Sequence, residues 1–213
     1  MKVGPVIAIL DYGMGNIHSI YNALTFIGAD ARIVGDPKGL KDAGGIVLPG
    51  VGAFGDGIRN LRRMGFEEAL SREVIEGGKP FLGICLGLQL LGSVGFEHGR
   101  NEGLGWIKGV VERFPASHEG EVLRVPHIGW NDVTFLKRDG LYSSLGETQS
   151  FYFVHSYVLR PDDPSVVSGT CSYGIEFAAS VESGNISAVQ FHPEKSHKSG
   201  LAVLKNFLDK TKG

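Results

Sequence analysis

The sequence predicts an α/β fold of three layers, in which a mostly parallel central sheet carries helices on both faces and an antiparallel β extension is added by the second half. Three observations support this prediction. Short apolar runs alternate with helical patterns in the first half, glycines stand at the ends of these runs, and short strand-like segments follow from about residue 105. No linker, repeat or low-complexity segment separates the halves, so we expect residues 1–213 to form a single domain.

The first half begins with a strand, a turn and a helix. Val6–Leu10 is a compact apolar run, which is typical of a strand buried in a parallel sheet. Residues 11–16 form a turn, and Asn16 suits the N-cap of a helix. Apolar residues then recur at helical spacing as far as Ile27, and Gly28 suits the C-terminal cap.

Further strands and helices extend this order. Residues 31–34 and 46–48 are predicted as short strands, and a helical pattern from Ile58 to Val74 has a break at Gly65. Residues 81–84 form the next apolar run, and the segment 86–91 after it begins a helix. The βαβαβ order predicts parallel strands with helices on both faces.

The second half contains short β-rich segments and one terminal helix. Turn residues separate the segments, which favours hairpin arms. The terminal helix carries Leu201, Leu204, Phe207 and Leu208 on its apolar face. The expected strands cover residues 110–114, 122–125, 151–154, 166–171, 177–181 and 186–191.

Composition excludes several classes of partner. The net charge is 21 − 23 = −2, so no basic excess indicates nucleic acid. No apolar stretch approaches the length of a membrane span or a secretory signal, and we expect neither a membrane partner nor export. The only cysteines are Cys85 and Cys171, which argues against a disulfide framework and for a reducing, cytoplasmic setting. Cys171 lies in a strand-like run and is expected to be a small buried side chain.

Cys85 occupies a position that is typical of a catalytic nucleophile. It stands between an apolar strand and a helix, bracketed by Gly83 and Gly87. Small residues two before and two after a nucleophile allow a sharp strand-to-helix turn with strained backbone angles. The unpaired N–H groups and the dipole of the following helix would stabilise a thiolate.

Among the seven histidines, His192 is the best candidate for the base that Cys85 needs. It ends a strand, where Pro193 stops the ladder and presents the imidazole beyond the sheet edge. Glu194 can orient the second ring nitrogen and stabilise the imidazolium, as the third member of a triad. A buried cysteine or a His-Pro-Glu turn has an ordinary structural explanation when taken alone. Their combination with the glycine-bracketed turn favours catalysis.

Attack of a thiolate on a carbonyl also requires donors for the developing oxyanion. The N–H of Leu86, at the helix N-terminus, is one candidate. The turn Gly50-Val51-Gly52 can supply another, because glycines let a peptide N–H face inward. An ordinary βα turn is the alternative explanation of this glycine pair.

Other common sites fit the sequence poorly. Gly13-Met-Gly15 follows a strand, but His18 occupies the sixth position of the dinucleotide fingerprint, so we do not expect a dinucleotide to bind at this turn. His192 and His197 lack a second closely spaced ligand pair, so we expect no metal. We therefore expect no cofactor.

The motifs resemble three signatures of the class I (triad) glutamine amidotransferases. These are Pro49-Gly-Val-Gly, Gly83-Ile-Cys85-Leu-Gly-Leu-Gln89 and Phe191-His192-Pro-Glu194. A finer resemblance, to glutaminase subunits of imidazole glycerol phosphate synthases, spans essentially the whole chain. It rests on Asp11-Tyr-Gly-Met-Gly-Asn16, Pro49-Gly-Val-Gly-Ala-Phe54, Val125-Pro-His-Ile-Gly-Trp-Asn131, Tyr152-Phe-Val-His-Ser-Tyr157 and His192-Pro-Glu-Lys-Ser196.

The resemblance implies a complete glutaminase mechanism. Cys85 would attack the side-chain amide of L-glutamine, His192 would carry the proton to ammonia, and a glutamyl thioester would be hydrolysed. Gln89 and Glu97 make chemical sense as substrate contacts, because a zwitterionic amino acid needs an acceptor for its ammonium. The implied substrate-binding residues are Gly50, Gly52, Gln89, Glu97, His155, Ser156 and Tyr157, and the implied oxyanion hole is Val51, Gly52 and Leu86.

The resemblance also implies a protein partner. Family members work as heterodimers with a (β/α)₈-barrel cyclase subunit, through which ammonia reaches a ribulosyl aminoimidazole carboxamide nucleotide. The products are imidazole glycerol phosphate, for histidine synthesis, and AICAR. The glutaminase is nearly silent until the partner binds substrate, and rotation of a peptide in Gly50-Val51-Gly52 is the expected switch. The implied interface residues are Asn16, His127, Trp130, Tyr152 and Lys195.

Three alternatives stay open at this point. One is a glutaminase subunit of another triad amidotransferase, of the pyridoxal phosphate or anthranilate synthase type, although Pro126-His-Ile-Gly-Trp130 argues against both. The second is a non-catalytic regulatory subunit, and the third is an unrelated thiol hydrolase of the same fold. For Trp130 itself, a core position is the alternative to an interface.

Overall fold

The computed structural model, which describes residues 4–118 and 120–212, contains five parallel strands built largely from the apolar runs of the first half. Four of them are β1 (Val6–Leu10), β2 (Asp30–Val34), β3 (Gly45–Gly50) and β4 (Phe81–Cys85). The fifth, β15 (Ile186–Val189), comes from near the C-terminus and joins the others through parallel pairing with β4. The register of β3 and β4 places Gly50 opposite Cys85.

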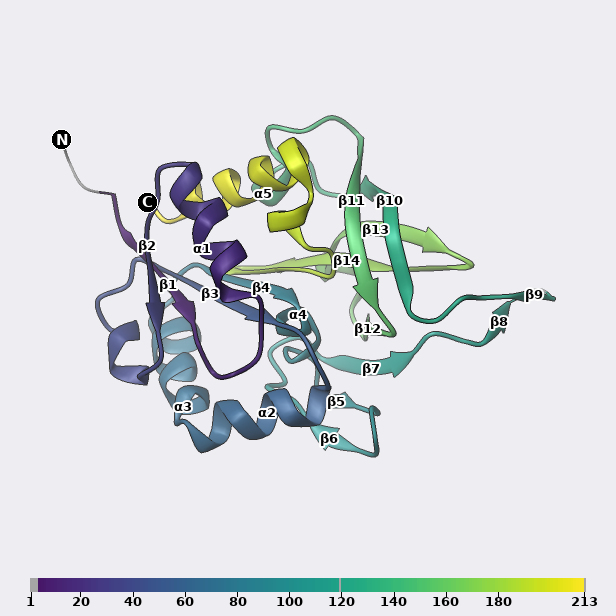
Figure 1. The fold of residues 1–213 in the computed structure, drawn as a ribbon, viewed down its shortest axis with the longest axis horizontal. Coiled ribbons are helices and arrows are strands. Elements are labelled where there is room, and N and C mark those ends of the chain that lie inside the picture. Colours follow the sequence, from purple (N-terminus) through teal and green to yellow (C-terminus); the bar gives the residue numbers. More distant parts are fainter. Residues whose placement is uncertain (1–3, 119, 213) are drawn as a thin grey trace.

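Four antiparallel strands extend this set into one sheet. They are β10 (His127–Phe135), β11 (Thr148–His155), β13 (Val167–Tyr173) and β14 (Ile175–Ser183). The strand order is β11-β10-β13-β14-β15-β4-β3-β1-β2, and β14 pairs with β15 in antiparallel fashion (Figure 1). The predicted parallel core with an antiparallel extension is confirmed, and the described extension is nearly as wide as the core.

Two smaller sheets lie beside the main one. β12 (Tyr157–Pro161) and β7 (Gly109–Arg113) pair in antiparallel fashion, and two short strands complete that sheet. A separate hairpin projects from the molecule (Figure 1). The short strands are β5 (Val94–Gly95) and β6 (Asn101–Glu102), and the hairpin is β8 (Ser117–His118) with β9 (Glu121–Val122).

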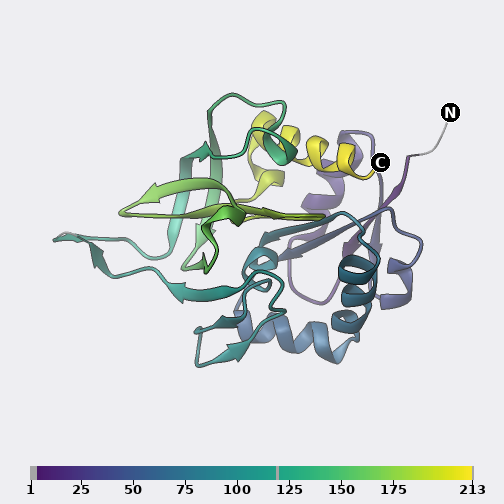
Figure 2. The same ribbon diagram turned by 180° about the vertical axis from the view of Figure 1, so that it is seen from behind.

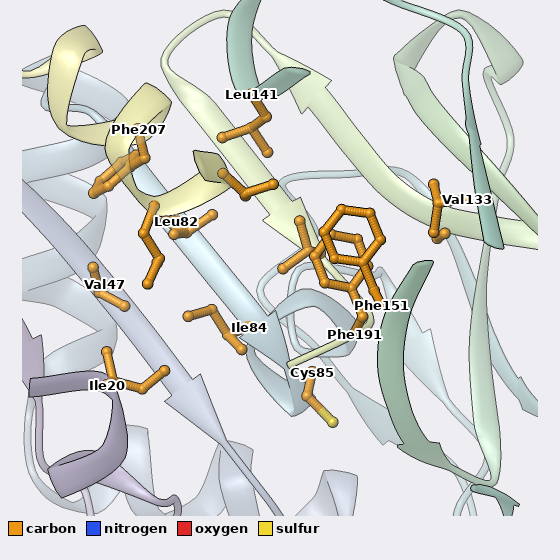
Figure 3. Close-up of a cluster of buried hydrophobic side chains, with 14 of the residues drawn as sticks. Ile20, Val47, Leu82, Ile84, Cys85, Val133, Leu141, Phe151, Phe191 and Phe207 are labelled. Carbon is orange, nitrogen blue, oxygen red and sulfur yellow. The ribbon is translucent and has the colours of Figure 1, made fainter. Parts of the chain in front are cut away.

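Helices cover both faces of the parallel strands, as predicted (Figures 1 and 2). On one side, α1 (Ile17–Phe26) and α5 (His197–Lys210) pack against a cluster that includes Ile7, Ile9 and Leu82 (Figure 3). On the other, α2 (Phe54–Arg63) and α3 (Phe66–Leu70) pack against alternate residues of the same strands, such as Ala8 and Leu10. Because successive side chains of each strand point to opposite faces, they contribute to two hydrophobic cores, one on each side of the sheet.

The remaining helices are short. The turn α4 (Leu86–Gln89) follows β4 directly. The others are η1 (Pro37–Leu40), η2 (Ser71–Glu76), η3 (Gly140–Tyr142), η4 (Pro164–Val166) and η5 (Pro193–Lys195). No described helix is long and apolar enough to cross a membrane.

The structure differs from the sequence predictions at four elements. The helix expected over residues 86–91 ends at Gln89. The strand expected over residues 122–125 is reduced to a pair ending at Val122. Strand β10 was not predicted, because its inward positions are apolar only at the end, and the first three are His127, Gly129 and Asn131. Strand β12 was also missed.

Candidate active site

Cys85 sits on a strained turn between β4 and α4. Its backbone angles are φ 55° and ψ −107°, a region that side chains other than glycine rarely adopt. The two flanking glycines permit this turn. A Cβ at Gly83 would lie 2.7 Å from the carbonyl oxygen of Gly87, and one at Gly87 would lie 2.0 Å from that of Leu48. The bracket of small residues is therefore a steric requirement of the elbow.

The sulfur of Cys85 lies at the edge of the hydrophobic cluster (Figure 3) and is nearly buried. One of its two hydrogen-bond partners is an acceptor and the other is a donor. The thiol donates to the carbonyl oxygen of Val154 at 3.8 Å, and the side-chain amide of Gln190 donates to Sγ at 3.7 Å. The first contact requires the thiol hydrogen, whereas the second stays available when the hydrogen has left.

His192 and Glu194 form a buried pair. Nδ1 of His192 lies 2.8 Å from Oε1 of Glu194, and the two side chains are 3% and 1% exposed. Burial lowers the pKa of His192, but its interactions with Cys85 and Glu194 outweigh burial and raise that pKa to about 9. Nε2 makes no hydrogen bond to any described residue, because the Cys85 thiol is directed at Val154 instead. Nε2 can therefore accept the thiol proton once the Cys85 side chain turns toward it.

The end of β3 borders the elbow. Gly50 has no room for a side chain, because a Cβ there would lie 2.5 Å from the Tyr12 hydroxyl and 2.8 Å from Cβ of Leu86. Gly52 has a φ of +113°, which favours glycine. The parallel register thus brings the predicted oxyanion turn and the Leu86 N–H to the same end of neighbouring strands as Cys85.

A cavity of about 430 Å³ opens over the sulfur. One wall is the turn after β3, a second is α4 and the loop that carries Glu97, and a third is the end of β11 with the start of β12. Gly50 is not among the residues that line this cavity. The lining residues are Val51, Gly52, Ala53, Cys85, Leu86, Gln89, Glu97, Val154, His155, Ser156 and Tyr157.

Gln89 and Glu97 are both held in place by backbone groups. Nε2 of Gln89 donates to the carbonyl of Tyr157 at 3.0 Å and to Oε1 of Gln190 at 3.2 Å, which uses both of its hydrogens. Its own Oε1 is left as an acceptor. Glu97 accepts the N–H of Phe54, the first residue of α2, at 2.7 Å through one oxygen. The site therefore offers acceptors, one of them charged, which suit an ammonium group.

A pair of buried histidines includes His155 of the cavity lining and His127, which packs behind it. His127 and His155 face each other across β10 and β11, with Nδ1 of His127 3.0 Å from Nε2 of His155. The carbonyl of Tyr157 accepts from Nδ1 of His155 at 2.9 Å, and Nδ2 of Asn131 donates to Nε2 of His127 at 2.8 Å. These partners fix both rings as neutral tautomers. Burial lowers the pKa of His127 to about 4 and that of His155 to about 3.

The predicted interface residues divide into two groups. Trp130 is 46% exposed, lies 6.1 Å from the Tyr152 ring and stacks on His197 at 4.9 Å. Lys195 is exposed with its Nζ 5.8 Å from the Tyr152 ring centre, and Asn16 is exposed at the start of α1. The prediction for His127 is wrong: it is 1% exposed, because its ring packs within the aromatic core. The core alternative for Trp130 is excluded by its exposure.

Sequence reasoning missed two buried polar residues beside Cys85. Gln190 is fully buried and lies between the end of β15 and His192. A glutamine inside the apolar run 186–191 was the available signal. The buried hydroxyl of Tyr12 lacks a hydrogen-bond partner among the described residues, and its pKa is raised by burial and by nearby Cys85. Tyr12 lies in the motif Asp11-Tyr-Gly-Met-Gly-Asn16, but no role was predicted for it.

Comparison with known proteins assigns a family. The model of the family glutamine amidotransferase class-I matches residues 8–211. The chain is 49% identical over 203 residues to imidazole glycerol phosphate synthase subunit HisH of Geobacter sulfurreducens, covering 94% of this chain and 97% of that protein. The subunit of the same name from Moorella thermoacetica is 49% identical over 201 residues, with 94% and 93% covered.

Solved structures share the fold. One described as glutamine amidotransferase aligns with a TM-score of 0.75 at 22% identity, covering 96% of this chain and 98% of that chain. PurLQS from Thermotoga maritima aligns with a TM-score of 0.76 at 23% identity, covering 97% and 99%. At this identity the structures support the three-layer architecture alone.

Proposed function

This chain belongs to the class I glutamine amidotransferases, and from that premise we propose that Cys85, His192 and Glu194 hydrolyse the side-chain amide of L-glutamine to glutamate and ammonia. The observation that carries the proposal is the buried His192–Glu194 pair beside a cysteine on a strained elbow. Within the family, the chain is the glutaminase subunit of imidazole glycerol phosphate synthase and serves histidine biosynthesis.

The first half of the reaction forms a thioester. Nε2 of His192 takes the proton of Cys85, and Sγ attacks the amide carbon of glutamine. Glu194, at 2.8 Å from Nδ1, holds the ring and stabilises the imidazolium. The N–H groups of Leu86 and of the Val51-Gly52 turn stabilise the oxyanion, and one such donor is typically worth about 10²–10³ in rate.

The second half releases the products. The imidazolium of His192 returns its proton to the leaving nitrogen, the C–N bond breaks, and ammonia departs. The same ring then accepts a proton from water, whose oxygen attacks the thioester carbon, and the thiol is regenerated with glutamate. The raised pKa of His192 favours its role as the acid in the first release.

The cavity suits the amino-acid end of glutamine. A free carboxylate oxygen of Glu97 and Oε1 of Gln89 can accept from the substrate ammonium. Ser156 and Tyr157 form the opposite wall. His155 acts on this wall through the Tyr157 carbonyl, which it fixes from behind.

The partner is a (β/α)₈-barrel cyclase subunit in a heterodimer. Ammonia released into water becomes ammonium and diffuses away, so its use by a second site requires a sealed contact. Trp130 and Lys195 are exposed and lie beside the half-buried ring of Tyr152, and aromatic and cationic side chains of this kind anchor interfaces. The free thiols of Cys85 and Cys171 support a cytoplasmic location.

Covalent trapping tests the nucleophile directly. A glutamine analogue that carries an electrophilic ketone in place of the amide should add one equivalent of mass to the chain, at Cys85. The Cys171→Ser variant should be labelled like the wild type, because burial raises the pKa of that thiol to about 12. Labelling that persists in Cys85→Ser, or none in the wild type, would favour a non-catalytic subunit.

A further inference from the structure

The helix after Cys85 is a single turn, so other groups must stabilise the thiolate. α4 ends at Gln89, and four residues align few peptide dipoles behind the sulfur. The sulfur is nearly buried, and burial without compensation disfavours a charged thiolate. Besides His192, which becomes an imidazolium when it takes the thiol proton, a side-chain donor in the described part of the chain already bonds Sγ: the amide of Gln190 at 3.7 Å.

The orientation of this amide is determined by the backbone. The carbonyl of Tyr157 can only accept, so the group of Gln89 that faces it must be Nε2. The same Nε2 faces Gln190 at 3.2 Å, so Gln190 must present its oxygen there. Nε2 of Gln190 is thereby directed at Sγ, and the reverse orientation of the Gln190 amide would place its donor against the donor of Gln89.

The sheet holds Gln190 level with the sulfur. Val189, the last residue of β15, pairs with Ile84, so Gln190 directly follows β15 at the level where Cys85 ends β4. The N–H of Gln190 is itself bonded to the carbonyl of Ala179 at 2.8 Å. Its side chain is fully buried, which excludes competition from bulk water.

From this geometry we propose that Gln190 is a further catalytic residue, whose amide stabilises the thiolate form of Cys85. The two contacts of the sulfur favour opposite protonation states. The carbonyl of Val154 accepts from the thiol and favours the neutral form, whereas the donor Gln190 favours the anion. Transfer of the proton to His192 removes the first contact and strengthens the second.

The chain of hydrogen bonds behind Gln190 makes it a preorganised donor. Gln89 connects it to the Tyr157 carbonyl, and His155 holds that carbonyl from the other side at 2.9 Å. Fixed dipoles directed at a developing charge need no reorganisation when the charge forms. This inference rests on the proposed role of Cys85 as the nucleophile.

The pH dependence of Cys85 alkylation tests the inference without any substrate. In a Cys171→Ser background, the rate of reaction with iodoacetamide is followed by intact mass from pH 5 to 10. Gln190→Met keeps the side-chain length but removes the donor, and the midpoint should rise by about one pH unit. The matched variant Gln149→Met, which loses a bond to the Ser199 hydroxyl instead, should keep the wild-type midpoint.

Glutamine turnover separates this inference from the proposed function. Gln190→Met should lower kcat about tenfold in the complex with little change in KM, because the donor acts on the nucleophile. If Gln190→Met does not fold, Gln190→Asn withdraws the amide by one methylene and should raise the midpoint in the same way. An unchanged midpoint, or an equal rise in Gln149→Met, overturns the role of Gln190. An inactive wild type overturns the proposed function and leaves the alkylation result valid.

Discussion

At the scale of single residues, the site is defined by where each proton can go. One ring nitrogen of His192 is bonded to Glu194, and the other has no partner among the described residues. The second nitrogen is therefore available to accept the proton of Cys85. His127 and His155 are committed at both nitrogens and remain neutral. The histidines therefore divide into a base and a rigid pair because of their hydrogen-bond partners.

Removing the carboxylate should lower the pKa of His192. In Glu194→Gln, NMR titration of the His192 ring should give a midpoint at least about one unit below the value near 9 of the wild type, because a charged acceptor is lost. The pKa of His192 in the folded protein lies above its value of 6.5 in the unfolded chain. The contribution of His192 to the free energy of unfolding is therefore complete below pH 6.5 and is lost as pH rises to about 9. Glu147→Gln, at a side chain 84% exposed, is the control, and equal midpoints in the two variants would refute the assignment.

The buried histidine pair should make the fold sensitive to acid. The pKa of His155 is lowered to about 3, so below pH 6.5 the unfolded chain binds a proton that the folded chain refuses. The free energy of unfolding in urea should fall by about 2 kcal/mol from pH 7 to pH 5 through His155 alone, and His127 acts in the same direction. His155→Gln should reduce this loss, and the exposed His18→Gln should not. Identical slopes in all three proteins would exclude the pair as the source.

At the scale of elements, the C-terminal ends of neighbouring strands position the reactive groups. β3, β4 and β15 run parallel and end together, so their C-terminal ends bring the oxyanion turn, the nucleophile and the base into one place. The antiparallel strand β11 lies at the side of the site, where the backbone N–H of His192 donates to the carbonyl of Tyr152 at 2.9 Å. Glycines at these ends permit the close approach.

The glycine after the nucleophile should be intolerant of even one methyl group. In Gly87→Ala, the new Cβ would meet a backbone oxygen at 2.0 Å, and the free energy of unfolding should fall by about 3 kcal/mol with loss of glutamine turnover. In Gly146→Ala, the nearest atom lies 3.7 Å away on a flexible side chain, and the change should be small. Thermal and urea unfolding of both variants measure the difference. A Gly87→Ala protein as stable and active as the wild type would contradict the steric account of the elbow.

The sequence allowed prediction of those elements whose apolar pattern matches their burial. β1 was predicted to the residue, and β3, β4 and α1 within a few residues, because their inward positions are apolar. β10 was missed because its first three inward positions are His127, Gly129 and Asn131, so the apolar pattern is limited to its last residues. Gln190 escaped notice for a related reason, since its hydrogen-bond partners come from distant parts of the chain. Such pairings exist only after folding.

At the scale of the whole molecule, one sheet connects the catalytic edge with the proposed partner surface. We propose that the halves fold as one domain, because β15 pairs with β4 on one side and with β14 on the other. Strand β10 carries exposed Trp130 and, next to it, Asn131, which bonds to buried His127. His127 bonds in turn to His155 in the cavity lining, so hydrogen bonds connect β10 with the proposed glutamine site.

Truncation of the exposed tryptophan should weaken the complex. Trp130→Ala should raise the Kd for the cyclase subunit at least about tenfold in calorimetric titration, because a half-exposed aromatic ring beside Tyr152 and His197 is a typical anchor. Leu136→Ala removes another exposed apolar side chain next to the same strand and should leave the Kd unchanged. A Kd for Trp130→Ala equal to that of the wild type would place the interface elsewhere.

Glutamate release from L-glutamine, measured with and without the cyclase subunit and its nucleotide substrate, tests the central claim most directly. The account predicts slow release by the free chain, strong stimulation by the loaded partner, and no release from Cys85→Ala or His192→Asn under either condition. Glutamine turnover that the cyclase and nucleotide leave unchanged, or that survives in Cys85→Ala, would contradict it.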